Sequence, residues 1–308
     1  MSVVFRDAYL TVRRGGGSVY QRGRGKLSRA KRRILDFLRD VEQQTRPPEP
    51  APPPPPASAD PVEFQAPMGI HARAPNGMRI YAIGDIHGRA DLLIRLMKLI
   101  EQDASDAPEV RKVIVFLGDY VDRGFQSRDV IEYLSSGVLN TYETHFIKGN
   151  HEYAFEMFLS DPTFGPEWAR FGGAETLMSY GIQPPRSKID KGGWEQVCAQ
   201  LNHVLPVEHR RFLNELLLFK ELGDYIFVHA GLRPGLSLAE QNERDFMWIR
   251  DEFLSDPGAF DRIIVHGHTP ITEPHRDYRR IGIDTGAYLT GKLTAAVFTE
   301  DDVRFIST

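Results

Sequence analysis

The sequence predicts an α/β domain of about 230 residues that follows a basic N-terminal arm. Two observations predict this arrangement. From residue 78 onward, short apolar runs alternate with stretches of helical periodicity, and a proline-rich segment separates this pattern from a strongly basic beginning. The 308 residues are 41% hydrophobic and 26% charged, which is typical of a soluble globular protein.

The basic arm comprises residues 1–45, which carry 11 Lys or Arg and 4 Asp or Glu, a net charge of +7. Because the whole chain carries −4, the rest carries −11. Within the arm, LSRAKRRILDFLRDV (27–41) has apolar residues at helical spacing. The simpler interpretation is a solvated tail. The alternative is a basic amphipathic helix for an acidic partner or an anionic membrane surface, and no specific nucleic acid is predicted.

Residues 46–77 form a predicted linker, because TRPPEPAPPPPPASADP (45–61) excludes helix and strand and favours extended polyproline conformations. The predicted catalytic domain is therefore 78–308. Its expected strands are short runs rich in Ile, Val, Phe or Tyr, as buried strands are. They are MRIYAIGD (78–85), KVIVFLGD (112–119), HFIKGN (145–150), DYIFVHAG (224–231), RIIVHGH (262–268) and IGIDTG (281–286). RADLLIRLMKLIEQ (89–102) predicts an amphipathic helix after the first strand.

The cysteine count and the absence of long apolar runs bear on the compartment. Cys198 is the single cysteine, so no disulfide can form within the chain. No apolar run approaches the roughly 20 residues that cross a bilayer, and the first residues lack the features of a signal peptide. We therefore expect a cytoplasmic protein.

Polar side chains follow five of the six predicted strands, each beside a glycine. The motifs are G-D-I-H-G (84–88), G-D-Y-V-D-R-G (118–124), G-N-H-E (149–152), H-A-G (229–231) and H-G-H (266–268). Binding sites in α/β sheets form beyond the carboxyl ends of the strands. If these ends meet, one pocket collects six candidate ligands: Asp85, His87, Asp119, Asn150, His229 and His268.

Two carboxylates, three imidazoles and one amide oxygen suit Mn²⁺, Fe²⁺ or Zn²⁺ better than Ca²⁺, which prefers oxygen throughout. Six groups exceed the needs of one tetrahedral ion, so two ions that share a carboxylate are predicted. Each residue alone has a simpler explanation: Asp85 as a helix cap, Asn150 as a turn residue and a buried histidine as part of the core. Their joint occurrence at successive strand ends favours the metal site.

Together, G-D-I-H-G, G-D-Y-V-D-R-G and G-N-H-E resemble the signature of the metal-dependent phosphoprotein phosphatases, within the calcineurin-like metallophosphoesterases. MWIRDEF (247–253) and IDTGAYLTGKLT (283–294) are most similar to the bacterial and bacteriophage-lambda branch, which includes symmetrical dinucleoside tetraphosphatases. The resemblance covers residue 78 to the end. It implies the calcineurin-like fold, a central β-sandwich flanked by helices.

The resemblance also implies roles for the ligands. Asp85 and His87 would hold the first metal ion, Asp119 would bridge the two ions, and Asn150, His229 and His268 would complete the second site. The cofactors implied are two divalent ions, Mn²⁺ in the first place, with Fe and Zn as alternatives.

Four further residues have roles implied by the same resemblance. His151 would be the general acid, with Asp122 orienting and charging its ring, and Arg123 and Arg250 would grip the phosphate. Many related enzymes end this motif series with G-H-x-H, but this chain departs from that pattern because Pro270 stands at the last position. His266 has no implied role, and we expect it to be structural or to support the ligands.

The function expected first is therefore hydrolysis of phosphomonoesters, in particular phospho-Ser/Thr of a phosphoprotein substrate, by direct attack of a metal-bridging hydroxide. The alternative is a symmetrical dinucleoside tetraphosphate hydrolase or another nucleotide phosphohydrolase. A third hypothesis is a docking module without activity, which the full ligand set disfavours. The region that distinguishes these substrates is expected at 155–220, lining or covering the pocket.

Overall fold

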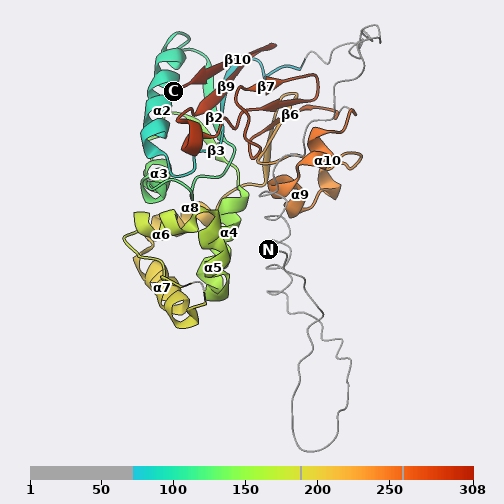
Figure 1. Ribbon diagram of the computed structural model, residues 1–308. Coiled ribbons are helices and arrows are strands. Elements are labelled where there is room, and N and C mark those ends of the chain that lie inside the picture. Colours follow the sequence, from blue (N-terminus) through green and yellow to red (C-terminus); the bar gives the residue numbers. More distant parts are fainter. Residues whose placement is uncertain (1–71, 188, 259) are drawn as a thin grey trace, which may run out of the picture. The chain divides into compact units, whose positions relative to one another are not determined.

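The computed structural model describes residues 72–187, 189–258 and 260–308 (Figure 1). The predicted basic arm and most of the predicted linker lie outside these residues, so both stay predictions. Within the described part, the predicted α/β fold with a central β-sandwich is confirmed, and all six predicted strands are present.

The first sheet has the strand order β10-β9-β1-β2-β3. Its parallel strands are β1 (Met78–Ile83), β2 (Arg111–Phe116) and β3 (Glu143–Phe146). The crossovers between them are α2 (Ala90–Ser105) and α3 (Ser127–Ser135). The hairpin of β9 (Thr294–Thr299) and β10 (Asp302–Ser307) adds to β1 in the antiparallel sense, and its two strands were not predicted.

The second sheet has the order β4-β5-β6-β8-β7. Three strands are parallel: β5 (Tyr225–Val228), β6 (Ile263–His266) and β8 (Arg280–Gly282). Two short antiparallel strands form its edges, β4 (Phe219–Leu222) and β7 (His275–Arg276). Both were missed in the sequence, because FKEL of β4 and HR of β7 form no apolar run.

The core lies between the two sheets. Ile80 and Val115 of the first sheet and Phe227 and Val265 of the second belong to one cluster of buried side chains, together with Phe298 of β9. Each such side chain stabilises the fold by roughly 1.5–3 kcal/mol. Tyr81 alternates to the outer face of β1, where its hydroxyl donates to Asp103 of α2 at 2.8 Å. Strands of the first sheet are thus covered on both faces, which explains their continuous apolar runs.

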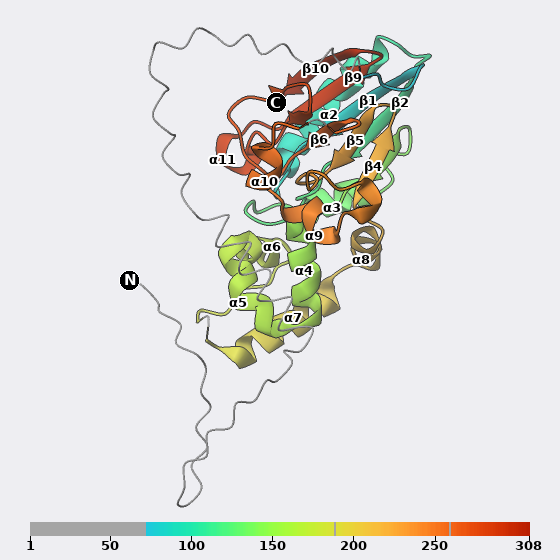
Figure 2. The same ribbon diagram turned by 90° about the vertical axis from the view of Figure 1, so that its right-hand side faces the viewer.

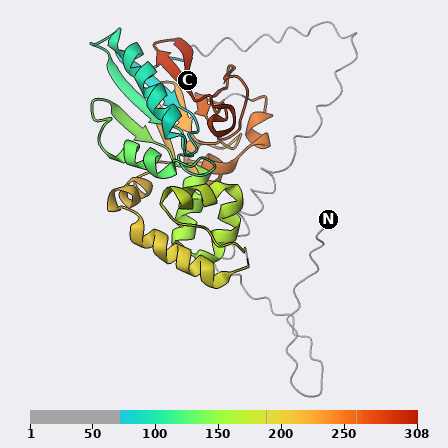
Figure 3. The same cartoon turned by 60° about the vertical axis from the view of Figure 1, so that its left-hand side comes forward.

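The region expected to cover the pocket forms a separate group of helices, which Figures 1 and 3 show together beside the sheets. They are α4 (Asn150–Ser160), η1 (Pro162–Phe164), α5 (Gly165–Trp168), η2 (Ala169–Gly173, a π-turn), α6 (Ala174–Ser179), α7 (Lys191–Val204) and α8 (Val207–Asn214). Aromatic rings hold them together: Trp168 stacks on Phe155 and Phe158. We refer to residues 150–214 as the helical segment.

The second sheet has its own cover on the other side of the sandwich, visible in Figure 2. It consists of η3 (Leu238–Glu240), α9 (Glu243–Trp248) and α10 (Asp251–Leu254). Phe246 and Phe253 of these helices pack on Val228 and Ile264. One more short helix, α11 (Ala287–Thr290), follows β8. Among the described residues, no helix combines the length and apolar character needed to cross a membrane.

Candidate metal centre

The five polar motifs stand at or just after the ends of β1, β2, β3, β5 and β6. Most of their residues lie in loops, but Asn150, His151 and Glu152 begin α4 and His266 ends β6. These strands are parallel within each sheet, so their carboxyl ends lie at the same edge of the sandwich. Hydrogen bonds cross between the loops of the two sheets, for example from the His268 amide to both oxygens of Asp85 at 3.1 Å. The predicted convergence of the strand ends is therefore present.

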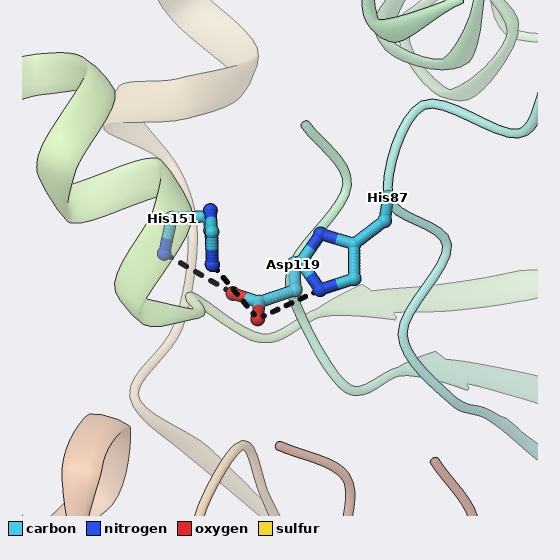
Figure 4. A group of neighbouring side chains, drawn as sticks. All are labelled: His87, Asp119 and His151. Atoms are coloured by element: carbon cyan, nitrogen blue, oxygen red, sulfur yellow. Dashed lines mark hydrogen bonds and ion pairs between the residues drawn. The ribbon is translucent and has the colours of Figure 1, made fainter. Parts of the chain in front are cut away.

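Asp119 occupies the centre of the site (Figure 4). Its Oδ2 lies 3.5 Å from Nε2 of His87, and its Oδ1 lies 3.4 Å from Nε2 of His229. One carboxylate thus presents each oxygen to a different imidazole. This is the arrangement that a carboxylate shared by two ions requires.

A compact set of donor atoms lies on the Oδ1 side of Asp119. Nε2 of His229 is 3.0 Å from Oδ1 of Asn150 and 3.1 Å from Nδ1 of His268, and the last two atoms are 3.1 Å apart. Ligand atoms about 2.1 Å from a common ion lie at similar distances from one another. The three side chains are buried.

The far nitrogens of two imidazoles are fixed by backbone carbonyls. Nδ1 of His87 donates to the carbonyl of Val121 at 3.0 Å, and Nδ1 of His229 donates to that of Leu117 at 2.8 Å. Burial lowers the pKa of both histidines, so each ring is neutral at neutral pH. Each Nε2 therefore keeps a free lone pair that points towards Asp119, which suits a metal ligand.

Buried carboxylates give the centre an excess of negative charge. Burial raises the pKa of Asp85 well above its usual value, and the charges of Asp284 and Asp119 raise it further. Burial also raises the pKa of Asp284 to about 6. Asp284 was not among the predicted site residues, although it stands just after β8, the sixth predicted strand. Divalent cations would compensate this charge.

Glu152 holds the backbone around Asp119. Its carboxylate accepts hydrogen bonds from the amides of Asp119 (2.9 Å), Tyr120 (2.7 Å), Val121 (3.2 Å) and Gly149 (3.0 Å). Glu152 thus supports both the loop around Asp119 and the first turn of α4. Gly149 lies so close that a Cβ there would be 2.2 Å from Oδ1 of Asp119. The motif glycine thus makes room for the carboxylate.

Backbone strain is concentrated at the site. Among the residues that the structure describes, six that are not glycine have φ in the left-handed region: His87, Asp119, Asp122, Arg123, His268 and Glu300. Five of them are predicted site residues. Such conformations are uncommon outside glycine and persist where the surrounding structure enforces them, often at functional sites.

His151 lies beside the shared carboxylate, as Figure 4 shows. Its Nδ1 is 2.7 Å from Oδ2 of Asp122, and its Nε2 is 4.0 Å from Oδ2 of Asp119. Arg123 donates to the same Nε2 at 3.2 Å. Because an arginine can only donate, the neutral ring has its proton on Nδ1, directed at Asp122. The contact with Asp122 matches the arrangement implied for the general acid; the role itself stays a prediction.

Both predicted phosphate-binding arginines border the donor atoms. Arg250 donates from Nε to Nε2 of His268 and from Nη2 to its carbonyl, each at 3.1 Å. Burial and the nearby charge of Arg123 lower the pKa of Arg250, so the two guanidiniums lie within electrostatic reach of each other. Arg123 also lies over the ring of Tyr288 at 4.7 Å, and that ring contacts His87 at 5.3 Å. Tyr288 was not among the predicted site residues, although it belongs to the segment IDTGAYLTGKLT (283–294).

His266 lies apart from the donor atoms. Its Nδ1 donates to the carbonyl of Gly267 at 3.0 Å, and its Nε2 accepts from Arg280 of β8 at 3.3 Å. Burial lowers its pKa to about 3. The ring packs edge-on against Phe253. His266 is therefore a structural residue between β6, β8 and α10.

These side chains fit two divalent ions. Among the described residues, two buried groups have ligand atoms within 4.8 Å of one another: His87, Asp119 and His151, and Asp119, His229 and His268. Asp119 belongs to both. The first group contains His151 rather than Asp85, whose oxygens both lie 3.1 Å from the amide nitrogen of His268. The individual ligand assignments stay predictions.

A buried cluster for two ions, a His–Asp pair and two arginines at the strand ends of a β-sandwich define a metal-dependent phosphoesterase. Comparison with protein families agrees. The family described as calcineurin-like phosphoesterase matches residues 78–305, and the chain belongs to this family.

Several relatives of known name match most of the chain. They include the asymmetrical bis(5'-nucleosyl)-tetraphosphatases PrpE of Anoxybacillus flavithermus (27% identical, 71% of this chain and 89% of the relative), Halalkalibacterium halodurans (28%, 75% and 93%) and Bacillus subtilis (24%, 71% and 90%). A crystal structure described as a "putative diadenosine tetraphosphatase" is 20% identical and covers 77% of this chain and 98% of its own, with a TM-score of 0.50. This likeness shows the fold.

Proposed function

We propose that this phosphoesterase hydrolyses dinucleoside tetraphosphates. The observation that carries the proposal is the match to relatives named as bis(5'-nucleosyl)-tetraphosphatases over 89%, 93% and 90% of their lengths. It favours the alternative in the sequence analysis over the phosphoprotein phosphatase expected first. The relatives are named asymmetrical, whereas the resemblance implied symmetrical cleavage, so we propose the asymmetrical reaction. This yields a nucleoside triphosphate and a nucleoside monophosphate.

The predicted ligands Asp85, His87 and Asp119 would hold one divalent ion, and Asp119, Asn150, His229 and His268 the other. Bound ions of this kind supply an activated nucleophile and neutralise phosphate charge. Arg123 and Arg250 bind the remaining phosphate oxygens, because a guanidinium forms paired hydrogen bonds with phosphate. A polyphosphate bridge carries several negative charges, which two neighbouring arginines suit.

His151 moves the proton. In the structure its Nε2 accepts from Arg123. When Arg123 turns to the phosphate, Nε2 is free to take a proton from water, while Nδ1 remains bound to Asp122. The protonated ring then donates from Nε2 to the oxygen of the leaving group. A leaving nucleotide carries a phosphate oxygen of low basicity, so it needs this proton less than an alkoxide does.

Apolar residues close in sequence to Arg123 and Tyr288 support a nucleotide substrate, and we refer to Phe125, Tyr288 and Leu289 as the apolar rim. Tyr288 is half-buried against Arg123 and His87. Leu289 next to it is 78% exposed, and Phe125, two residues after Arg123, is 65% exposed. Exposed aromatic rings offer stacking surfaces to nucleobases.

The proposal is tested with the purified protein and Mn²⁺ on diadenosine tetraphosphate and a phosphoserine peptide, with products separated by ion-exchange chromatography. We expect ATP and AMP in equal amounts, at a kcat/KM well above that for the peptide. Two ADP would overturn the asymmetrical reaction. A higher kcat/KM for the peptide would overturn the proposal that dinucleoside tetraphosphates are the substrate and would favour the phosphoprotein phosphatase expected first.

Variants of the apolar rim are tested in the same assay. Phe125→Ser and Leu289→Ser should raise KM for diadenosine tetraphosphate and leave p-nitrophenyl phosphate unaffected, because only the first substrate carries bases. Val138, 54% exposed after α3, provides the control substitution Val138→Ser. Equal KM values in all three variants would contradict a role of the rim in nucleotide binding.

A further inference from the structure

The carboxylate of Asp122 accepts hydrogen bonds from three different parts of the chain. His151 of α4 is 2.7 Å from Oδ2, and the indole Nε1 of Trp168 donates to the same oxygen at 2.9 Å. The hydroxyl of Thr176 in α6 donates to Oδ1 at 2.6 Å. All four side chains are buried. Two of the three donors thus come from the region 155–220, which was expected to line or cover the pocket.

The same stretch also binds the backbone that carries Asp122 and Arg123. The amide of Asp122 donates to Oγ1 of Thr176 at 2.9 Å, and the amide of Arg123 donates to the carbonyl of Gly172 at 3.1 Å. The hydroxyl of Thr176 therefore contacts Asp122 twice, at the backbone amide of Asp122 and at the carboxylate of Asp122.

The close approach depends on Gly172 in the π-turn η2. Gly172 has φ of 105°, and a Cβ there would lie 2.3 Å from the amide nitrogen of Arg123. Asp122 and Arg123 are themselves consecutive left-handed residues, with φ of 71° and 67°. Two adjacent residues in this conformation need outside support. Residues 165–179 of the helical segment provide it through the contacts above.

We propose that Trp168 and Thr176 are positioning residues that hold Asp122, and through it the imidazole of His151, in the orientation for proton transfer. The inference rests on the proton-donor role of His151 in the proposed function, but it does not depend on which phosphate ester is the substrate. Its physical basis is that three donors fix both oxygens of one buried carboxylate, leaving a single direction for the bond to Nδ1 of His151.

Thr176→Val removes one donor with little change of volume. Trp168→Phe removes the other donor together with part of a buried ring system, and that loss of volume needs a control of its own. We expect kcat for phenyl phosphate, a poor leaving group, to fall about tenfold or more, which is part of the usual contribution of a general acid. For p-nitrophenyl phosphate, whose leaving group needs little protonation, kcat should change less than about threefold. KM should stay the same for both substrates, and Thr176→Ser should restore turnover of phenyl phosphate.

Trp194 provides the matched control. It is buried in the same helical segment and contacts Phe158, but its Nε1 has no hydrogen-bond partner among the described residues. Trp194→Phe therefore tests loss of a buried indole without loss of a bond to Asp122. A loss of equal size on the two aryl phosphates, or the same pattern in Trp194→Phe, would overturn the positioning role.

A second readout needs no turnover. In the ¹⁵N spectrum of the metal-free protein, His151 should have its proton on Nδ1 in the wild type, with slow exchange. In Thr176→Val that signal should broaden or shift towards the other tautomer, while Trp194→Phe keeps it. An unchanged His151 signal in Thr176→Val would contradict the proposal. Wild-type cleavage of aryl phosphates without cleavage of diadenosine tetraphosphate would overturn the proposed function alone.

Discussion

The two oxygens of Asp119 face different imidazoles, and every other group of the centre is arranged around this carboxylate. His268 belongs to the set on the Oδ1 side, where its Nδ1 lies 3.1 Å from Asn150 and His229. His266, two positions earlier, is equally buried but bonds Arg280. Within one motif, His268 thus lies among the candidate metal ligands, whereas His266 supports the fold.

His268→Gln should bind one equivalent of Mn²⁺ less tightly, by a factor of about ten or more, because one of the donors near Oδ1 of Asp119 is replaced. His266→Gln should keep the wild-type stoichiometry and affinity. Isothermal titration calorimetry on both variants measures this. Loss of metal in His266→Gln but not in His268→Gln would reverse the assignment.

His151→Asn should keep the fold and both metals, since its backbone and not its side chain begins α4. Turnover should fall strongly for phosphoserine peptides and little for diadenosine tetraphosphate, whose leaving group needs less protonation. Steady-state kinetics on the two substrates test this. Unchanged turnover of the peptide would refute the general-acid role.

The sequence predicted ten candidate site residues, and the structure brings them to one edge of the sandwich. Nine of them follow strand ends, whereas Arg250 lies between α9 and α10 and reaches the site through His268. Asp284 was not predicted, although D-T-G (284–286) has the same spacing as the motif H-A-G (229–231). Trp168 and Thr176 could not be found, because nothing in a helical pattern shows that a tryptophan and a threonine eight positions apart reach the same carboxylate. The edge strands β4 and β7 could not be found because their residues, FKEL and HR, form no apolar run.

The start of α4 is tied to the loop after β2 by Glu152, whose carboxylate accepts four backbone amides. These hydrogen bonds join the ends of β2 and β3 and fix the backbone conformation from which the carboxylate of Asp119 projects. Glu156, one turn further along α4, instead pairs with Lys148 at 2.5 Å near the surface. The helix thus carries one carboxylate that organises the centre and one that does not.

Glu152→Gln replaces an acceptor by an NH₂ group that faces backbone amides, so the loop carrying Asp119 should lose its order. We expect Mn²⁺ affinity to drop roughly 10- to 100-fold, as for other groups that orient metal ligands. Glu156→Gln on the same helix should bind Mn²⁺ as the wild type does. Equal affinities in the two variants would show that the loop holds its shape without Glu152.

Stability of the whole domain should depend on pH through His266. Burial lowers its pKa to about 3 in the folded protein, against about 6.5 for an unfolded chain. The unfolded state therefore binds more protons below pH 6.5, and folding loses up to about 1.4 kcal/mol per pH unit as the pH falls from there towards 3. Above pH 6.5 the histidine is neutral in both the folded and the unfolded state, so His266 no longer makes the free energy of unfolding depend on pH.

Urea unfolding at pH 7.5, 6 and 5 in the presence of a chelator measures this dependence. His266→Gln should be less stable than the wild type at pH 7.5 and should lose less free energy of unfolding on acidification. The same slope in both proteins would mean that His266 does not carry the acid sensitivity.

The arm and the linker precede the described domain, and every contact of the site comes from residues 85–288. Deletion of residues 1–60 should therefore leave hydrolysis of p-nitrophenyl phosphate intact. Kinetics of the truncated protein beside the full chain check this, with circular dichroism as a control for folding. An inactive but folded truncation would place the arm in the catalytic unit.

The central claim is that Asp119 lies between two divalent ions. Anomalous diffraction from crystals grown with Mn²⁺ tests it most directly. We predict two peaks about 3.5–4 Å apart, one on each side of this carboxylate, with His87 at one and His229 and His268 at the other. A single peak, or peaks remote from Asp119, would contradict the account.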